Sequence, residues 1–146
     1  MPRFVTHDKV ISHIIEGKVR FSEVDSMHIV WHGNYLKYFE DAREQFGLHY
    51  GMAYLDIYHS GFQTPIVKTE INHKSPLKYG DSFKVKISLH QTIAAKIVYS
   101  YEVYNLATDK LVATGQTIQV FTDGNDELQL LCPAFYEKWF NQINWD

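Results

Sequence analysis

The chain of 146 residues contains one cysteine, Cys132, and no long hydrophobic run. A single cysteine cannot form an intrachain disulfide, which excludes the disulfide framework typical of an oxidising compartment. No window approaches the roughly 18 consecutive apolar residues of a membrane helix, and residues 1–18 lack the apolar run of an export signal. We therefore expect a cytoplasmic protein without a membrane span.

Strong positive charge and nucleotide-binding motifs are also missing. A formal net charge of -3 and a pI near 6.2 create no field that would attract the phosphates of a nucleic acid, so nucleic acid is excluded as a partner. There is no glycine-rich phosphate loop, which argues against nucleoside triphosphates and NAD. The Gly-x-Ser-x-Gly motif is absent too, which disfavours an α/β-hydrolase.

The composition is that of a globular domain. Hydrophobic residues make up 45% and aromatic residues 15% of the chain, whereas disordered chains have low hydrophobicity and high net charge. A chain of this length forms one core, and no linker or repeat divides it. We predict a single domain over residues 1–146.

Hydrophobic periodicity predicts one strand, one long helix and then four strands. Residues 15–21 alternate as in a half-buried strand, and from Tyr35 to Phe46 apolar residues recur every three or four positions, as in an amphipathic helix. Asn34 is the predicted N-cap, and Gly47 or Gly51 the end. Further strands are predicted at 64–75, 83–89, 96–105 and 111–121, followed by a short helix at 133–143. Consecutive strands joined by short turns predict an α+β fold with an antiparallel sheet.

The residues from Glu23 to Tyr35 form the most unusual stretch. They hold two carboxylates, two histidines and a tryptophan in an irregular segment that leads into the start of a helix. A carboxylate such as Asp25 could attack a carbonyl or activate water there, while a free backbone N–H of the helix start holds the oxyanion. Spacing alone leaves open that Asp25 only accepts hydrogen bonds from its own loop.

Two other groups have simpler interpretations. His28 and His32 lie four residues apart and make a metal site conceivable, but they match no closed zinc pattern, and we predict no metal. Cys132 has no base nearby in sequence and is interpreted as a small buried apolar residue.

The stretch and its surroundings resemble the 4-hydroxybenzoyl-CoA thioesterase family, and its Tol-Pal-linked branch in particular. The likeness covers about residues 15–122. It rests on these motifs: Phe21-Ser-Glu-Val-Asp25, Ile29-Val-Trp-His32, Asn34-Tyr35, Tyr38-Phe39-Glu40-Asp-Ala42-Arg43, Thr64-Pro65-Ile66-Val67, Tyr79-Gly80-Asp81 and Ala113-Thr-Gly115.

The resemblance implies a hotdog fold, in which an antiparallel sheet of about five strands wraps around one long central helix, here with a short C-terminal helix added. It implies hydrolysis of an acyl-CoA or acyl-carrier thioester, with Asp25 as nucleophile or general base and His32 at the oxyanion position. It implies a homodimer or homotetramer, and no cofactor beyond the coenzyme A of the substrate. The predicted substrate-binding positions are Val30, Trp31, Gly33, Tyr35, Thr64 and Pro65.

Several features bear on the substrate. The family usually has Gly where His28 stands, so a larger side chain there could narrow the acyl pocket. The aromatic residues after the helix, Tyr54, Tyr58 and Phe62, could influence the choice of acyl group. Candidate partners for the CoA phosphates are Lys68, Lys74, Lys78, Lys84 and Lys86.

Two other functions remain open from the sequence. One is a non-catalytic hotdog protein that binds an acyl-CoA or acyl carrier, and the other is a hotdog dehydratase or hydratase that uses a histidine with a carboxylate.

Overall fold

The computed structural model describes residues 9–92 and 94–145. His7 and the beginning of the segment used to argue against an export signal lie outside the described residues. In chain order the elements are β1 (Val10–Lys18), the 3-10 helix η1 (Phe21–Glu23), α1 (Asn34–Tyr50), α2 (Tyr54–His59), β2 (Ile66–His73), β3 (Ser82–His90), β4 (Lys96–Asn105), β5 (Leu111–Val120) and α3 (Ala134–Asn141).

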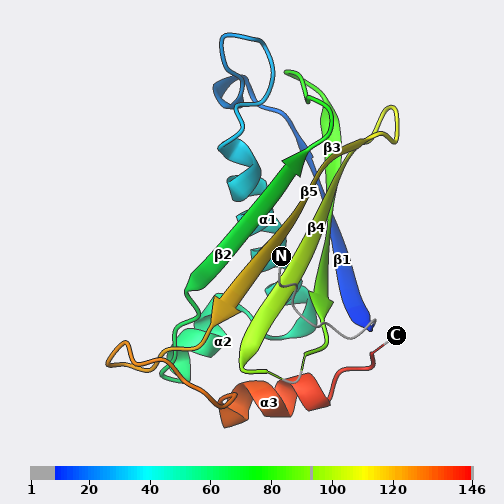
Figure 1. Ribbon diagram of the computed structural model, residues 1–146. Coiled ribbons are helices and arrows are strands. Elements are labelled where there is room, and N and C mark those ends of the chain that lie inside the picture. The colour runs from blue at the N-terminus through cyan, green and yellow to red at the C-terminus, as the bar shows by residue number, and fades with distance from the viewer. Residues whose placement is uncertain (1–8, 93, 146) are drawn as a thin grey trace.

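The five strands form one sheet in the order β1-β3-β4-β5-β2, and every neighbouring pair is antiparallel. The sheet curves around α1, while α2 and α3 lie near the lower end of the sheet in Figure 1. α1 packs mainly against β1 and β3. Consequently β2, at one edge of the sheet, is largely exposed along its length.

Aromatic side chains join α1 to the inner face of the sheet. The ring of Phe39 stacks on that of Tyr101 with centroids 4.1 Å apart, and Tyr38 packs on Phe83 at 4.4 Å. Gly115 lies under Phe39, so closely that a Cβ atom there would overlap the ring. The helix therefore approaches β5 at a position that has no side chain.

The predicted strands and helices are confirmed, with shifts at their ends. β4 has the predicted bounds, and β3 and β5 differ from them by one residue. The first strand, however, spans Val10–Lys18, and Phe21, predicted to be part of it, lies in η1 with 77% of its surface exposed. The N-cap prediction is wrong: Gly33 caps α1, and Asn34 is its first residue.

α2 was not predicted. It has six residues and turns only one and a half times, which is too short for a helical period to be recognised. The N–H of Ala53 donates to Oδ2 of Asp56 at 2.8 Å, a capping contact that starts this helix. Within residues 9–92 and 94–145, none of the helices has the length and apolar character needed to cross a membrane.

Candidate active site

Asp25 begins a tight turn between η1 and α1. Bridges between Val24 and Val30, and between Ile29 and Lys78, hold the two sides of this turn in place. The N–H of Asp25 donates to the carbonyl of Ile29 at 2.9 Å, and the carbonyl of Asp25 accepts from His28 at 2.9 Å. The position of Asp25 is therefore fixed from both sides by main-chain hydrogen bonds.

The two carboxylate oxygens of Asp25 differ in their surroundings. Oδ1 accepts a 2.8 Å hydrogen bond from the N–H of Met27, which closes the turn. Oδ2 accepts no hydrogen bond from the described part of the chain, and the residue is half-buried. One oxygen thus stabilises the loop, and the other is free to take a proton or attack a carbonyl.

The start of α1 lies a few residues further along the same loop. Asn34 and Tyr35 donate their N–H groups to the carbonyls of Trp31 and His32, whereas the N–H groups of His32 and Gly33 donate to nothing within the described residues. Free N–H groups at a helix start carry partial positive charge and bind oxyanions. The indole ring of Trp31 lies directly against the Cα of Gly33, so that any side chain at Gly33 would displace it.

Glu23 ties the loop to the helix. Its carbonyl accepts hydrogen bonds from the N–H of Trp31 at 2.9 Å and from Nδ2 of Asn34 at 2.8 Å. Its Oε1 accepts from the hydroxyl of Tyr38 at 3.1 Å and from the N–H of Arg20 at 2.8 Å. Burial and the nearby carboxylate of Glu23 raise the pKa of Tyr38, so this hydroxyl remains a donor. The sequence offered no signal for this role of Glu23.

His28 occupies a left-handed backbone conformation, with a φ of 66°. Residues other than glycine are strained there, because the Cβ atom crowds the following carbonyl. The side chain of His28 is exposed. The expectation that it narrows an acyl pocket stays a prediction, but the backbone supplies a separate reason why glycine suits this position.

The predicted substrate-binding residues fall into two groups. Trp31 and Gly33 flank His32 just before α1, in the same loop that carries Asp25. Val30 and Tyr35 are adjacent in the chain but buried, with 4% and 3% of their surfaces exposed. Burial raises the pKa of Tyr35 to about 12, and its ring packs against His73 at 5.1 Å. The side chains of Val30 and Tyr35 therefore lie in the core. Their predicted contact with the substrate stays a prediction.

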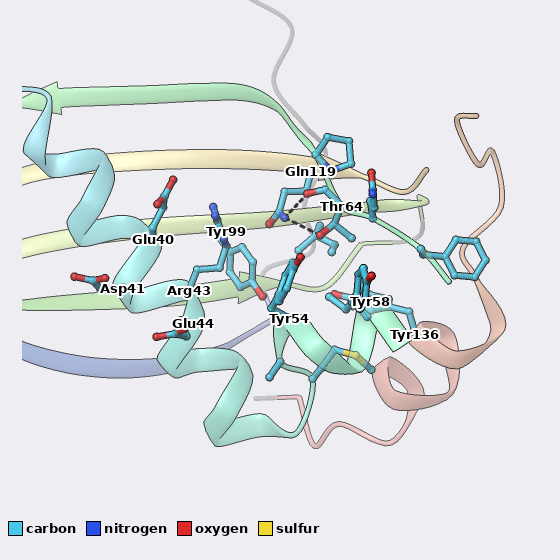
Figure 2. A pocket seen from close by; sticks show the side chains of 17 residues that line it. Glu40, Asp41, Arg43, Glu44, Tyr54, Tyr58, Thr64, Tyr99, Gln119 and Tyr136 are labelled. Carbon is cyan, nitrogen blue, oxygen red and sulfur yellow. Dashed lines mark hydrogen bonds between the residues drawn. The ribbon is translucent and has the colours of Figure 1, made fainter. Parts of the chain in front are cut away.

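Thr64 and Pro65, the second group, are part of a cavity of about 530 Å³ further along α1 (Figure 2). This cavity lies between α1, α2, α3 and the ends of β4 and β5. Gln119 donates from Nε2 to the carbonyl of Thr64 at 2.7 Å and to its hydroxyl at 3.1 Å. The aromatic residues after the helix line the cavity as well, together with three residues that the sequence did not indicate as binding residues: Arg43, Gln119 and Tyr136.

Two further kinds of chemistry were considered from the sequence, a metal site and a cysteine nucleophile. No group of three or more potential metal ligands occurs in the part of the chain that the structure describes. Burial and the nearby Glu137 raise the pKa of the Cys132 thiol to about 11, so it is protonated at neutral pH and a weak nucleophile. No hydrogen bond or ion pair joins Asp25 to His32 among residues 9–92 and 94–145.

Several known proteins have a similar sequence or the same fold. A 1,4-dihydroxy-2-naphthoyl-CoA hydrolase of Prochlorococcus marinus is 28% identical over 140 residues, covering 90% of each chain. YneP of Bacillus subtilis, which has been assigned as an acyl-CoA thioesterase, is 37% identical over 92 residues, or 63% of this chain and 67% of that protein. The DHNA-CoA thioesterase structure from Staphylococcus aureus superposes with a TM-score of 0.81 at 27% identity, covering 90% of this chain and 89% of that one.

The fold and these relatives define a hotdog-fold thioester hydrolase, which confirms the predicted fold class. The model of the Thioesterase-like superfamily matches residues 19–140. The chain belongs to this superfamily, whose members include hydrolases of acyl-CoA thioesters.

Proposed function

We propose that this protein hydrolyses an acyl-CoA thioester, with Asp25 as the catalytic carboxylate and the helix start as the oxyanion site. The observation that carries the proposal is the pairing of a free Oδ2 on Asp25 with the free N–H groups of His32 and Gly33 in one short loop. Thioester hydrolysis needs these two elements, a base or nucleophile and donors aimed at the developing oxyanion.

The reaction begins when the N–H groups at the helix start polarise the thioester carbonyl. Asp25 then acts in one of two ways. As a general base it takes a proton from a water molecule that attacks the carbonyl carbon; as a nucleophile it forms an anhydride that water hydrolyses in a second step. In both routes the C–S bond breaks and coenzyme A leaves as a thiolate, which is a good leaving group because thiols are far stronger acids than alcohols.

The structural neighbours support this reading of the substrate. One, at 20% identity and a TM-score of 0.76, is an aspartate-to-asparagine mutant of 4-hydroxybenzoyl-CoA thioesterase in complex with 4-hydroxybenzoyl-CoA, covering 88% of this chain and 97% of that one. Together with the motifs around Asp25, it supports placement near the 4-hydroxybenzoyl-CoA thioesterase family and its Tol-Pal-linked branch. Lys78, paired with Ile29 beside the turn, is the lysine best placed to meet a CoA phosphate.

The test is release of free thiol from a panel of aliphatic and aromatic acyl-CoAs, read with a thiol-reactive dye. Wild type should release thiol, and Asp25→Asn should lower turnover by about 10²–10⁴-fold. Asparagine keeps the oxygen that Met27 needs, so the loop should remain intact. No thiol release by wild type from any member, or near wild-type turnover by Asp25→Asn, would refute the proposal.

Asp123→Asn is the matched control. Asp123 also accepts a backbone hydrogen bond on Oδ1 two residues ahead, from the N–H of Asn125 at 2.9 Å, in a turn after β5. The two substitutions therefore make the same change in the same kind of turn. Only the one at Asp25 should abolish turnover.

We further propose that a second copy of the chain covers β2, giving a homodimer or homotetramer. Among the described residues β2 is an edge strand with β5 as its one neighbour, and Val67 on it is 60% exposed. Exposed edge strands are normally covered, because they otherwise pair with other chains. Light scattering at micromolar concentration distinguishes the states, and a monomer would contradict the proposal. A cytoplasmic location and the absence of a cofactor also remain proposals.

A further inference from the structure

Three residues that line the same cavity each carry a buried polar atom that has no hydrogen-bond partner within the described part of the chain. The atoms are Nη1 of Arg43, Oε1 of Gln119 and the hydroxyl of Tyr136, and they come from α1, β5 and α3. Gln119 is 6% exposed and Tyr136 is 3% exposed. Leaving a buried polar group unpaired costs about 1–3 kcal/mol. Each of the three is therefore an atom to which a bound ligand could supply the missing hydrogen bond.

The hydrogen-bonding character of these atoms restricts that ligand. The carbonyl of Thr64 can only accept, so the amide of Gln119 must turn its Nε2 towards it, which leaves Oε1 as an acceptor (Figure 2). Arg43 can only donate, and the hydroxyl of Tyr136 can do both. A ligand hydroxyl has the matching chemistry for all three, because it can donate to Gln119 and accept from both Arg43 and Tyr136.

Charge around the cavity argues against an anionic ligand group. Glu40, Asp41 and Glu44 line it from exposed positions on α1, and Arg43 is the one cation among its lining residues. The surplus of negative charge repels a carboxylate. Tyrosine and phenylalanine side chains from the neighbouring elements make much of the remaining wall, which suits an uncharged carbon skeleton.

The position of the cavity sets the length of the ligand. Its first residue on α1, Glu40, lies six residues beyond the helix start at Asn34, which is ~9 Å along the axis. The loop that carries Asp25 lies at the other end of α1 from α2 (Figure 1). An acyl group whose thioester carbonyl meets the helix start must therefore extend by about 10 Å to reach the cavity.

We propose that the cavity is a specificity site in which Arg43, Gln119 and Tyr136 bind the distal hydroxyl of an uncharged, medium-length acyl group. This inference rests on the proposed thioesterase function of Asp25 and names the class of acyl group. The carbon chain runs from the helix start along α1, and the hydroxyl enters the cavity beneath α2.

The test compares binding of matched CoA thioesters to the Asp25→Asn protein by calorimetry. We expect 10-hydroxydecanoyl-CoA to bind about five- to tenfold more tightly than decanoyl-CoA. The thioester of decanedioic acid, which ends in a carboxylate, should bind more weakly than either. Adding Tyr136→Phe should bring the first ratio close to one. Adding Tyr104→Phe, whose hydroxyl donates to Glu102 outside the cavity, should leave the ratio unchanged.

Tyr136→Phe also separates recognition from a structural role. Its hydroxyl has no partner within the described chain, so its removal should not lower the free energy of unfolding without ligand. Equal binding of the two decanoyl thioesters, or an unchanged ratio in Tyr136→Phe, would overturn the proposal. A hydroxyl preference found only between 4-hydroxybenzoyl-CoA and benzoyl-CoA would also overturn it, since that acyl group is too short.

Binding is measured without turnover, so the two proposals fail separately. If wild type hydrolyses no thioester but the binding ratio holds, the catalytic proposal is refuted and the specificity site stands. If wild type hydrolyses thioesters without favouring the hydroxylated acyl group, only the specificity site is refuted.

Discussion

Nδ2 of Asn34 donates a 2.8 Å hydrogen bond to the carbonyl oxygen of Glu23, eleven residues earlier in the chain. This contact joins the first residue of α1 to the beginning of the loop that carries Asp25. Asn34 is 6% exposed, so the bond is shielded from water. The loop and the helix start, which together make the candidate active site, are thereby held at a fixed distance.

Asn34→Ala should therefore weaken both stability and activity. Removing the side chain leaves the buried carbonyl of Glu23 with one donor fewer, and we expect a loss of about 1–2 kcal/mol in the free energy of unfolding. Thiol release should fall as well, because Asp25 moves relative to the helix start. Denaturant titration and a thiol assay measure the two effects. Asn72→Ala is the control, since its exposed 3.5 Å contact with Thr114 is weak. Equal losses in both variants would contradict the assigned role.

His28→Gly should stabilise the protein by about 1 kcal/mol, because glycine adopts a positive φ without steric cost. The urea midpoint should rise and the m-value should stay the same. His59→Gly is the comparison: His59 ends α2 in a helical conformation, where glycine is unfavourable, so that variant should be less stable. A lower midpoint for His28→Gly would show that the side chain makes a contact worth more than the backbone strain.

Gly115→Ala should destabilise the fold by about 1–3 kcal/mol, since the added methyl group overlaps the ring of Phe39 in a closely packed core. Gly124→Ala provides the matched control, because a Cβ atom there meets nothing within 4 Å. Thermal unfolding of the two variants tests the difference. If both melted like wild type, the close approach of α1 to β5 would be incorrect.

Stability should fall as the pH drops below about 6.5. The pKa of His13 is lowered by burial and by the charge of His49, whose ring stacks on it at 4.4 Å. The pKa of His90 is also lowered by burial. Both groups bind protons more weakly in the folded state than in the unfolded state, so acid favours unfolding. The contribution of the neutral histidines to the free energy of unfolding is complete above the ordinary histidine pKa of 6.5. It is lost as the pH falls through the lower pKa values that His13 and His90 have in the folded protein.

Denaturant titrations between pH 7.5 and pH 5 measure this dependence. His13→Asn should flatten the curve, because one of the two shifted groups is gone. His59→Asn, at an exposed position on α2, should leave its shape unchanged. A stability that does not change over this range would contradict the prediction.

The sequence predicted the meander well because its signals are local. β3 alternates regularly between buried and less buried residues, and short turns separate β3, β4 and β5, so the bounds of these three strands were found to within one residue. The beginning of β1 was missed because its inner face includes His13, which interrupts the apolar alternation before Ile15. The pairing of β2 with β5 could not be predicted, since these strands are far apart in the chain.

The loop that carries Asp25 and the cavity also differ in how far apart their residues lie in the chain. Asp25, His32 and Gly33 lie within nine residues, so a turn followed by a helix start was enough to assign them to one candidate site, and their catalytic roles stay predictions. The cavity combines residues from α1, α2, β4, β5 and α3, and Gln119 and Tyr136 look like ordinary strand and helix residues in the sequence. No motif marks them, because what distinguishes them within the described chain is one unpaired polar atom each, Oε1 of Gln119 and the hydroxyl of Tyr136.

The α+β fold class, the order of the elements and the place of Asp25 in the loop before a helix all followed from the sequence alone. These depend on side-chain alternation, turn residues and hydrogen bonds that act over a few residues. Tertiary packing added, for the described residues, that Oδ2 of Asp25 accepts no hydrogen bond, that β2 is largely exposed and that three residues lining one cavity each carry an unpaired polar atom. Burial and hydrogen-bond satisfaction depend on which distant segments pack together, and that is settled only when the whole sheet closes around α1.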